Sequence, residues 1–86
     1  MEIVFSGQAE RELDEADSGL REFFIQHAEK IASAPMKRHL RYGLPFFAEN
    51  VTRQARIVYN IENGVCYILH CFKTHKEYER WYKSFK

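Results

Sequence analysis

The sequence predicts a small α+β domain, with a mainly antiparallel sheet, an N-terminal helical hairpin packed on it and a C-terminal helix. Two apolar runs joined by Asn63-Gly64 indicate a β-hairpin, because this dipeptide favours a two-residue turn with positive φ at both positions. Apolar residues at helical spacing precede this hairpin, and a second helical pattern follows it. With 86 residues, 45% of them hydrophobic, the chain has room for one core. We expect a single domain over residues 1–86.

The first third of the chain predicts a strand and two helices. Residues 2–5 are expected to form the strand, and Ser6 is a suitable N-cap for the first helix. The segment Asp17-Ser18-Gly19 interrupts this helix. From Leu20 to Ser33, apolar residues recur at helical spacing and predict a second, amphipathic helix. The two helices are expected to pack as an antiparallel hairpin on the sheet.

The strands follow, and the turn sets their register. Residues 46–52 alternate as a strand, before the hairpin begins. With the Asn-Gly pair as the loop, alternation places Arg56 opposite Cys71, so that Arg56 and Lys73 would be diagonal neighbours on one face. Cys66 and Cys71 are an odd number of residues apart and are expected to point to opposite faces as buried thiols. No paired-ligand spacing predicts zinc or redox chemistry.

The last helix is expected to begin at about His75. Thr74 and Glu77 have the spacing of a capping box. The buried stripe of this helix would consist of Tyr78, Trp81, Tyr82 and Phe85. The free N–H groups and the positive dipole end of the helix would lie beside Lys73, His75 and Lys76. This arrangement favours the binding of a phosphate.

Charge is distributed unevenly along the chain. Residues 1–36 contain eight acidic and three basic residues, a net charge of −5, whereas residues 37–86 contain ten basic and four acidic residues, a net charge of +6. A basic segment with interleaved tyrosines suits a polyanion, although a solvated mixture of charges without a partner explains the composition equally well. Within it, Lys37, Arg38 and Arg41 lie between two prolines, where they form either phosphate contacts or a solvated loop.

Nothing in the sequence directs the chain to a membrane. It has no apolar run near 18 residues in length, and its start lacks the pattern of a secretory signal. We therefore expect a cytoplasmic protein without a membrane partner.

The order of the elements, with the opening MEIVFS, the strand RIVYNI and the exit strand YILHCFKTHKEY, resembles the RelE/ParE superfamily of bacterial and archaeal toxins. The resemblance covers essentially the whole chain. Within the superfamily, THKEYERWY is similar to the ending of HigB-type toxins, and the Arg-aliphatic-Val-Tyr strand is shared by RelE and YoeB types. The resemblance implies a RelE-like fold and the toxin of a type II toxin–antitoxin system. It also implies a ribosome-dependent mRNA endonuclease, or mRNA interferase, that inhibits translation.

The resemblance further implies partners and a mechanism. The partners are a cognate antitoxin, the ribosome and mRNA, and we expect the free protein to be a monomer. RelE-type cleavage uses no metal or cofactor, since the RNA 2′-hydroxyl attacks the adjacent phosphate. Such a reaction needs a base for the hydroxyl, cations for the phosphorane charge and an acid for the departing 5′-oxygen.

Individual residues match the positions that carry these roles. Arg56 matches the strand arginine of the family, which would stabilise the phosphorane. Lys73, His75 and Lys76 occupy the position after the exit strand where relatives place a basic residue. Tyr78 matches the tyrosine that stacks on or orients the substrate. The residues expected to bind RNA are Lys73, Arg53, Lys37, Arg38 and Arg41.

The acid and the base remain open at this stage. His75 suits either role, because an imidazole has a reference pKa of about 6.5. Glu49 is the other base candidate, and it stands where RelE carries a lysine, so the sequence departs there from the RelE lysine pair. Structural explanations also exist: Arg56 could pair with Glu49 or Glu77, and Tyr78 could serve only the core.

Two other functions fit the same resemblance. One is a ParE-like toxin that inhibits DNA gyrase by protein contact. The other is a catalytically inactive relative that binds RNA or sequesters an antitoxin. The cations at the predicted helix start favour the nuclease over the gyrase inhibitor.

Overall fold

The computed structural model describes residues 1–33 and 46–84, which form strands and helices in the predicted order. The elements are β1 (Glu2–Phe5), α1 (Gly7–Glu15), α2 (Ser18–Ser33), β2 (Phe47–Asn50), β3 (Arg56–Glu62), β4 (Val65–Phe72) and α3 (His75–Lys83). Lys37, Arg38, Arg41 and Phe85 lie outside the described residues. No described helix is long and apolar enough to cross a membrane.

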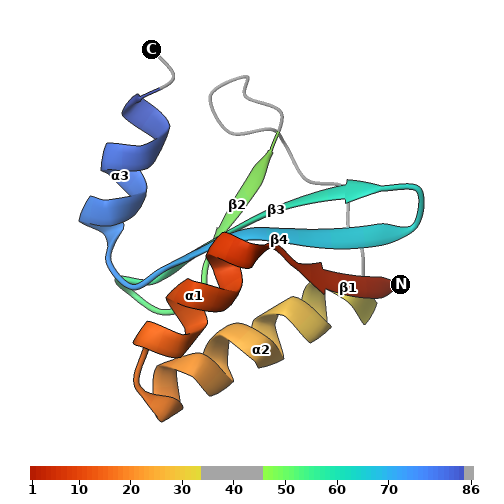
Figure 1. Ribbon diagram of the computed structural model, residues 1–86, viewed down its shortest axis with the longest axis horizontal. Coiled ribbons are helices and arrows are strands. Elements are labelled where there is room, and N and C mark those ends of the chain that lie inside the picture. Colours follow the sequence, from red (N-terminus) through yellow and green to blue (C-terminus); the bar gives the residue numbers. More distant parts are fainter. Residues whose placement is uncertain (34–45, 85–86) are drawn as a thin grey trace.

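The strands form one mixed sheet in the order β1-β4-β3-β2 (Figure 1). β3 is antiparallel to both of its neighbours, β2 and β4, whereas β1 runs parallel to β4. The predicted α+β fold with a mainly antiparallel sheet is therefore confirmed. β4 therefore lies between β1, the first strand of the chain, and β3, the strand that comes directly before it in sequence.

Local capping explains where the first two helices begin. The Ser6 hydroxyl oxygen accepts a hydrogen bond from the Ala9 N–H (3.0 Å) and donates one to the Leu69 carbonyl (2.9 Å), so it caps α1 as predicted and ties it to β4. Asp17 accepts from the Leu20 N–H at 2.8 Å. This cap explains why α2 begins two residues before the predicted Leu20.

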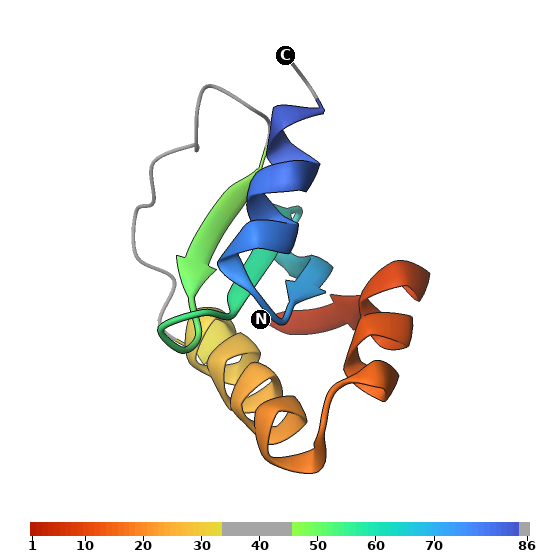
Figure 2. The same cartoon turned by 90° about the vertical axis from the view of Figure 1, so that its left-hand side faces the viewer.

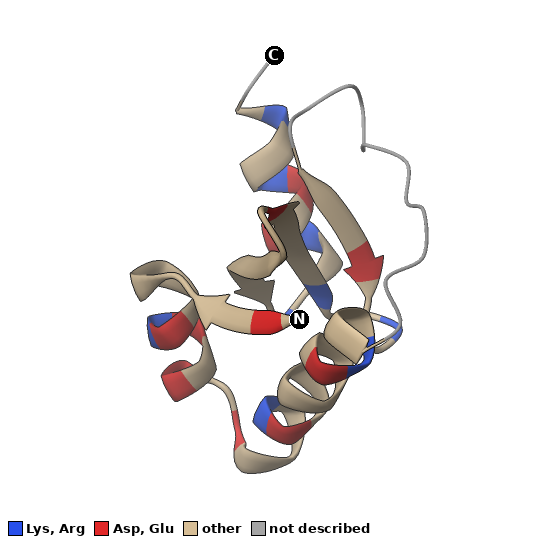
Figure 3. Ribbon diagram, turned by 90° about the vertical axis from the view of Figure 1, so that its right-hand side faces the viewer, with Lys and Arg blue, Asp and Glu red and all other residues tan. Residues whose placement is uncertain are grey.

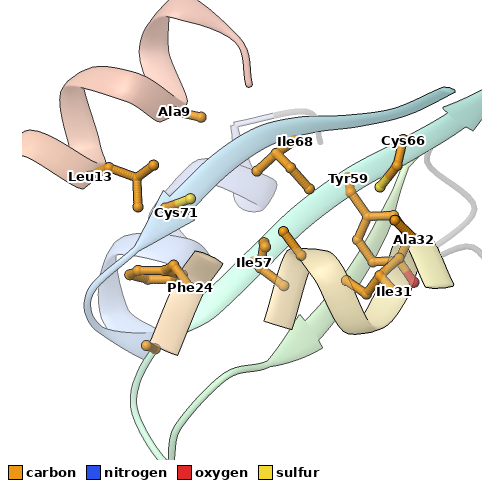
Figure 4. Packing of buried hydrophobic residues seen from close by; sticks show 12 residues of the cluster. Ala9, Leu13, Phe24, Ile31, Ala32, Ile57, Tyr59, Cys66, Ile68 and Cys71 are labelled. Carbon is orange, nitrogen blue, oxygen red and sulfur yellow. The ribbon is translucent and has the colours of Figure 1, made fainter. Parts of the chain in front are cut away.

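Side chains pack against both faces of the sheet. On one face, α1 and α2 cover a core shown in Figure 4. This core includes Ala9, Leu13, Phe24, Ile31, Ile57, Tyr59, Cys66, Ile68 and Cys71. On the other face, α3 covers a second cluster made of Phe46, Ala48, Val58, Phe72, Tyr78 and Tyr82. Figure 2 shows α3 alongside β2, where the rings of Phe46 and Trp81 lie 4.7 Å apart.

A β-bulge in β4 changes the predicted register. The turn forms as expected, with φ of 52° at Asn63 and 76° at Gly64. Pairing is regular as far as Tyr59 with Ile68, but Val58 then pairs with His70. Leu69 is thus an extra residue in β4.

Two predictions were wrong because of this bulge. Arg56 lies opposite Phe72 and not Cys71, so Arg56 and Lys73 are not the same-face diagonal neighbours that alternation predicted. Cys66 and Cys71 face the same core, since the extra residue reverses the alternation between them. Both are buried free thiols, as predicted. Burial raises the pKa of Cys71 to about 12 and also raises the pKa of Cys66.

Candidate active site

Several of the predicted site residues converge at the end of the hairpin that is remote from the Asn-Gly turn. Arg56 begins β3 directly opposite Phe72, the last residue of β4. Lys73 follows at once, and α3 begins at His75. Because paired residues of a ladder share a face, Arg56 lies on the face that α3 covers.

The capping box predicted for α3 is present. The Thr74 hydroxyl accepts from the Glu77 N–H at 3.1 Å, and the Glu77 carboxylate accepts from the Thr74 N–H at 3.2 Å. Glu77 therefore serves the helix start. The first turn holds the exposed side chains of His75 and Lys76 beside the exposed Lys73. The His75 Nε2 atom lies 3.4 Å from a carboxylate oxygen of Glu79, one turn further along.

Tyr78 anchors this first turn in the core. Its side chain is 4% exposed. Its ring centroid lies 6.2 Å from those of Phe72 and His75 and 5.0 Å from that of Tyr82. Tyr78 thus links the end of β4 to the exposed imidazole of the candidate site.

Arg56 is held by backbone carbonyls. Its Nη1 atom donates to the carbonyl oxygens of Thr52 (3.4 Å), Arg53 (3.1 Å) and Ala55 (3.1 Å). Within the described part of the chain, the guanidinium pairs with neither Glu49 nor Glu77, the two partners that sequence suggested. The exposed Arg53 lies in the same 51–55 turn.

Glu49 lies on the opposite face of the sheet from Arg56. It pairs with Ile57, a residue of the core under α1 and α2. One carboxylate oxygen lies 2.9 Å from Nε2 of His27, and the other accepts from the Tyr59 hydroxyl at 2.6 Å. The structure therefore separates Glu49 from the other candidate catalytic residues and joins it to α2.

Solved structures of toxins share this architecture. The isolated RelE toxin of E. coli has a TM-score of 0.71 and 17% sequence identity, over 99% of this chain and 98% of that chain. The YoeB–YefM toxin–antitoxin complex of Staphylococcus aureus gives a TM-score of 0.67 with 15% identity, over 84% of this chain and 94% of that chain. A metal-bound toxin from Helicobacter pylori gives 0.66 with 21% identity, over 90% and 97%. The chain has the RelE fold. No family model and no curated protein matches it.

The RelE fold of this chain also holds a pair of residues that sequence reasoning missed. Nδ1 of His70 lies 3.1 Å from one carboxylate oxygen of Glu12, and the other oxygen accepts from the Cys71 N–H at 2.8 Å. The His70 ring stacks on Phe72 at 4.7 Å and meets Trp81 at 4.8 Å. No sequence signal marks this pair, because its two members are 58 residues apart.

Burial and hydrogen bonding act in opposite directions on Glu12. Burial raises the pKa of its carboxyl. The hydrogen bonds with His70 and the Cys71 N–H, together with the electrostatic attraction of His70, lower the pKa by more than burial raises it, so the net pKa is lowered. Among residues 1–33 and 46–84, no cluster of three His, Cys, Asp or Glu side chains could hold a metal ion.

Taken together, α1 and α2 carry more acidic than basic residues. Figure 3 shows Asp and Glu along α1 and α2, with fewer Lys and Arg among them. The cations Arg56, Lys73 and Lys76 lie at the end of the hairpin instead. The uneven charge of the sequence is thus also uneven in space.

Proposed function

We propose that this chain is the toxin of a type II toxin–antitoxin system and acts as a ribosome-dependent, metal-independent mRNA endonuclease that inhibits translation. The RelE fold supports the first part, since solved neighbours include toxins in complex with antitoxins. The observation that carries the second part is the position of Arg56, Lys73, His75 and Lys76 at the end of the hairpin from which α3 begins. Cations and free helix N–H groups at one place suit a phosphate.

The proposed reaction is transfer within the RNA itself. A base removes the proton of the 2′-hydroxyl, the 2′-oxygen bonds to phosphorus, and the bond from phosphorus to the 5′-oxygen breaks. An acid protonates the departing 5′-oxygen, which leaves a 2′,3′-cyclic phosphate and a 5′-hydroxyl. Negative charge grows on the phosphoryl oxygens in the transition state, and Arg56 and Lys73 stabilise it there.

We assign the proton transfers to the group at the start of α3. His75 is 47% exposed on its side chain, within reach of a bound substrate, and an imidazole accepts or donates a proton near neutral pH. Lys76 supports it as a second cation. Glu49 lies on the other face of the sheet from Arg56, so we give it no role in this step.

The proposed partners follow from the same site. The ribosome presents the mRNA, and a cognate antitoxin covers the basic end of the hairpin. The neighbours support an antitoxin because several were solved as toxin–antitoxin complexes. We propose a cytoplasmic protein that is a monomer when free.

Cleavage of an mRNA placed in the A site of purified ribosomes tests the proposal. The wild-type protein, Arg56→Ala and His75→Ala are compared with chelator present throughout. We expect chelator-resistant cleavage that falls by about 100-fold or more in both variants, because each removes a group that stabilises the transition state or moves a proton. Lys30→Ala is the control, since this exposed cation lies on α2.

Three results would contradict the proposal. Cleavage that stops with chelator would exclude the metal-independent route. Full activity of Arg56→Ala would show that cleavage does not take place at the proposed site. Intact mRNA, with a folded protein that still stops cell growth, would exclude the nuclease, and inhibition of DNA gyrase would then be measured.

A further inference from the structure

The hydrogen bonds of Arg56 are all made from one corner of its guanidinium. This group carries five N–H donors on Nε, Nη1 and Nη2. The three carbonyl oxygens of Thr52, Arg53 and Ala55 all accept from Nη1. Within the described residues, the edge formed by Nε and Nη2 therefore keeps its donors for another acceptor.

Thr52 gives the turn its shape. Its hydroxyl oxygen accepts from the N–H groups of Gln54 (3.3 Å) and Ala55 (3.0 Å). The Val51 N–H donates to the Ala55 carbonyl at 2.9 Å, which closes the 51–55 turn. These bonds hold the carbonyls of Thr52, Arg53 and Ala55 so that they converge on one point, where Nη1 lies.

We propose that Thr52 is a positioning residue for phosphate cleavage: its hydroxyl shapes a carbonyl cradle that holds Nη1 of Arg56 and presents the Nε–Nη2 edge to the scissile phosphate. This inference rests on the proposed function. The two parallel N–H donors of the guanidinium edge can bind two phosphate oxygens at once, whereas the ammonium group of a lysine lacks this paired geometry. An arginine held before the substrate arrives also loses less rotamer freedom in the transition state than a mobile one.

The pair Thr52→Val and Thr52→Ser tests the role of the hydroxyl. Valine keeps the branched shape and removes the acceptor, whereas serine keeps the acceptor. We expect the single-turnover cleavage rate on programmed ribosomes to fall by about 10-fold in Thr52→Val, with little change in the concentration needed for half-maximal rate. Thr52→Ser should stay within about twofold of wild type. Thermal unfolding of each variant verifies that it is folded.

A double-mutant cycle separates positioning from a merely structural role. If Thr52 acts through Arg56, Thr52→Val should slow cleavage in the wild-type background but not in Arg56→Ala. Arg56→Lys should be nearly as slow as Arg56→Ala, because lysine lacks the paired donors. An equal loss in both backgrounds would show that the turn acts by another route and would overturn the inference.

The outcomes distinguish the inference from the function on which it rests. If the wild-type protein leaves mRNA intact, the proposed function fails and the role of Thr52 in cleavage fails with it. If the wild-type protein cleaves and Arg56→Ala does not, but Thr52→Val is as fast as wild type, only the inference fails. Nitrogen NMR adds a second readout: the Arg56 Nη signals should be distinct in the wild type and merge in Thr52→Val.

Discussion

Glu12 joins three parts of the molecule through one carboxylate. It stands on α1, accepts from the backbone of Cys71 in β4, and contacts His70, whose ring touches Trp81 on α3. The Cys71 N–H lies beyond the stretch of β4 that pairs with β1, so the carboxylate takes the place that a neighbouring strand would fill. A single side chain therefore completes the ladder of the central strand.

Substituting Glu12→Gln should lower stability in a pH-dependent way. The folded pKa of Glu12 lies below its usual value of 4.5, so its ionised form stabilises the fold above that pH, and the contribution is lost as the pH falls through the folded pKa. We expect a loss of about 1.5–3 kcal/mol at pH 7, the size of a hydrogen bond to a charged group, and a smaller difference from wild type below pH 4. Urea unfolding at several pH values measures it.

The exposed Glu10 provides the matched control for that experiment. It lies on the same helix, and Glu10→Gln removes the same charge from its first turn. This variant should cost only a few tenths of a kcal/mol. An equal loss in both variants, or a Glu12→Gln difference that is constant with pH, would contradict the account of Glu12.

At the scale of elements, the start of α3 depends on its capping box. Thr74→Ala removes the acceptor of the Glu77 N–H and should lower stability by about 1 kcal/mol. Thr74→Ser keeps the acceptor and should be nearly neutral. Thermal unfolding measures both, and hydrogen exchange in the first turn of α3 should rise in the alanine variant alone. Unchanged exchange in that variant would show that tertiary packing, through Tyr78, fixes the helix start without the cap.

The elements that sequence predicted well are those set by neighbouring residues. The turn at Asn63-Gly64 and the caps at Ser6 and Thr74 depend on side chains within a few positions, and all formed as expected. The bulge in β4 could not be predicted in this way. Glu12 contacts His70 and Cys71, the two residues that follow the extra Leu69, across 58 and 59 positions, and such a distant contact leaves no mark in the strand pattern.

In the candidate site, too, the features set by neighbouring residues could be predicted from the sequence, whereas those set by more distant contacts could not. Arg56, Lys73 and His75 all lie at one end of the hairpin, because the hairpin and the helix start are local structures, but the same-face pairing expected for Arg56 and Lys73 was wrong. The sequence did not show that Glu49 and Arg56 lie on opposite faces of the sheet. The 51–55 turn joins β2 to β3, and its geometry depends on the hydrogen bonds of the Thr52 hydroxyl. The contact between His27 and Glu49 also could not be predicted, since the two residues are 22 positions apart.

At the scale of the whole molecule, charge should govern the encounter with RNA. Binding to single-stranded RNA should weaken linearly in log affinity against log salt, by about 0.7 per phosphate contact. Replacing both Lys73 and Lys76 by alanine should lower this slope by about 1.4. Fluorescence anisotropy at several salt concentrations measures it.

Two exposed cations on α1 and α2 provide the control for the salt dependence. Arg11 and Lys30 are exposed on α1 and α2, so their joint replacement by alanine should leave the slope unchanged. If the Lys73/Lys76 pair and the Arg11/Lys30 pair changed the slope equally, the net charge of the protein would explain RNA binding, and the prediction of a binding site at the end of the hairpin would be wrong.

The order of the strands has a consequence for the synthesis of the protein. β4 is an inner strand that contacts β1, β3, α1, α2 and α3, yet it spans Val65–Phe72 of an 86-residue chain. Until β4 is made, β1 has no strand to pair with, and the apolar faces of α1 and α2 lack much of their core. The sheet thus forms completely only after β4 has been made, so the basic site at the end of the hairpin is assembled later than the elements that precede it in sequence.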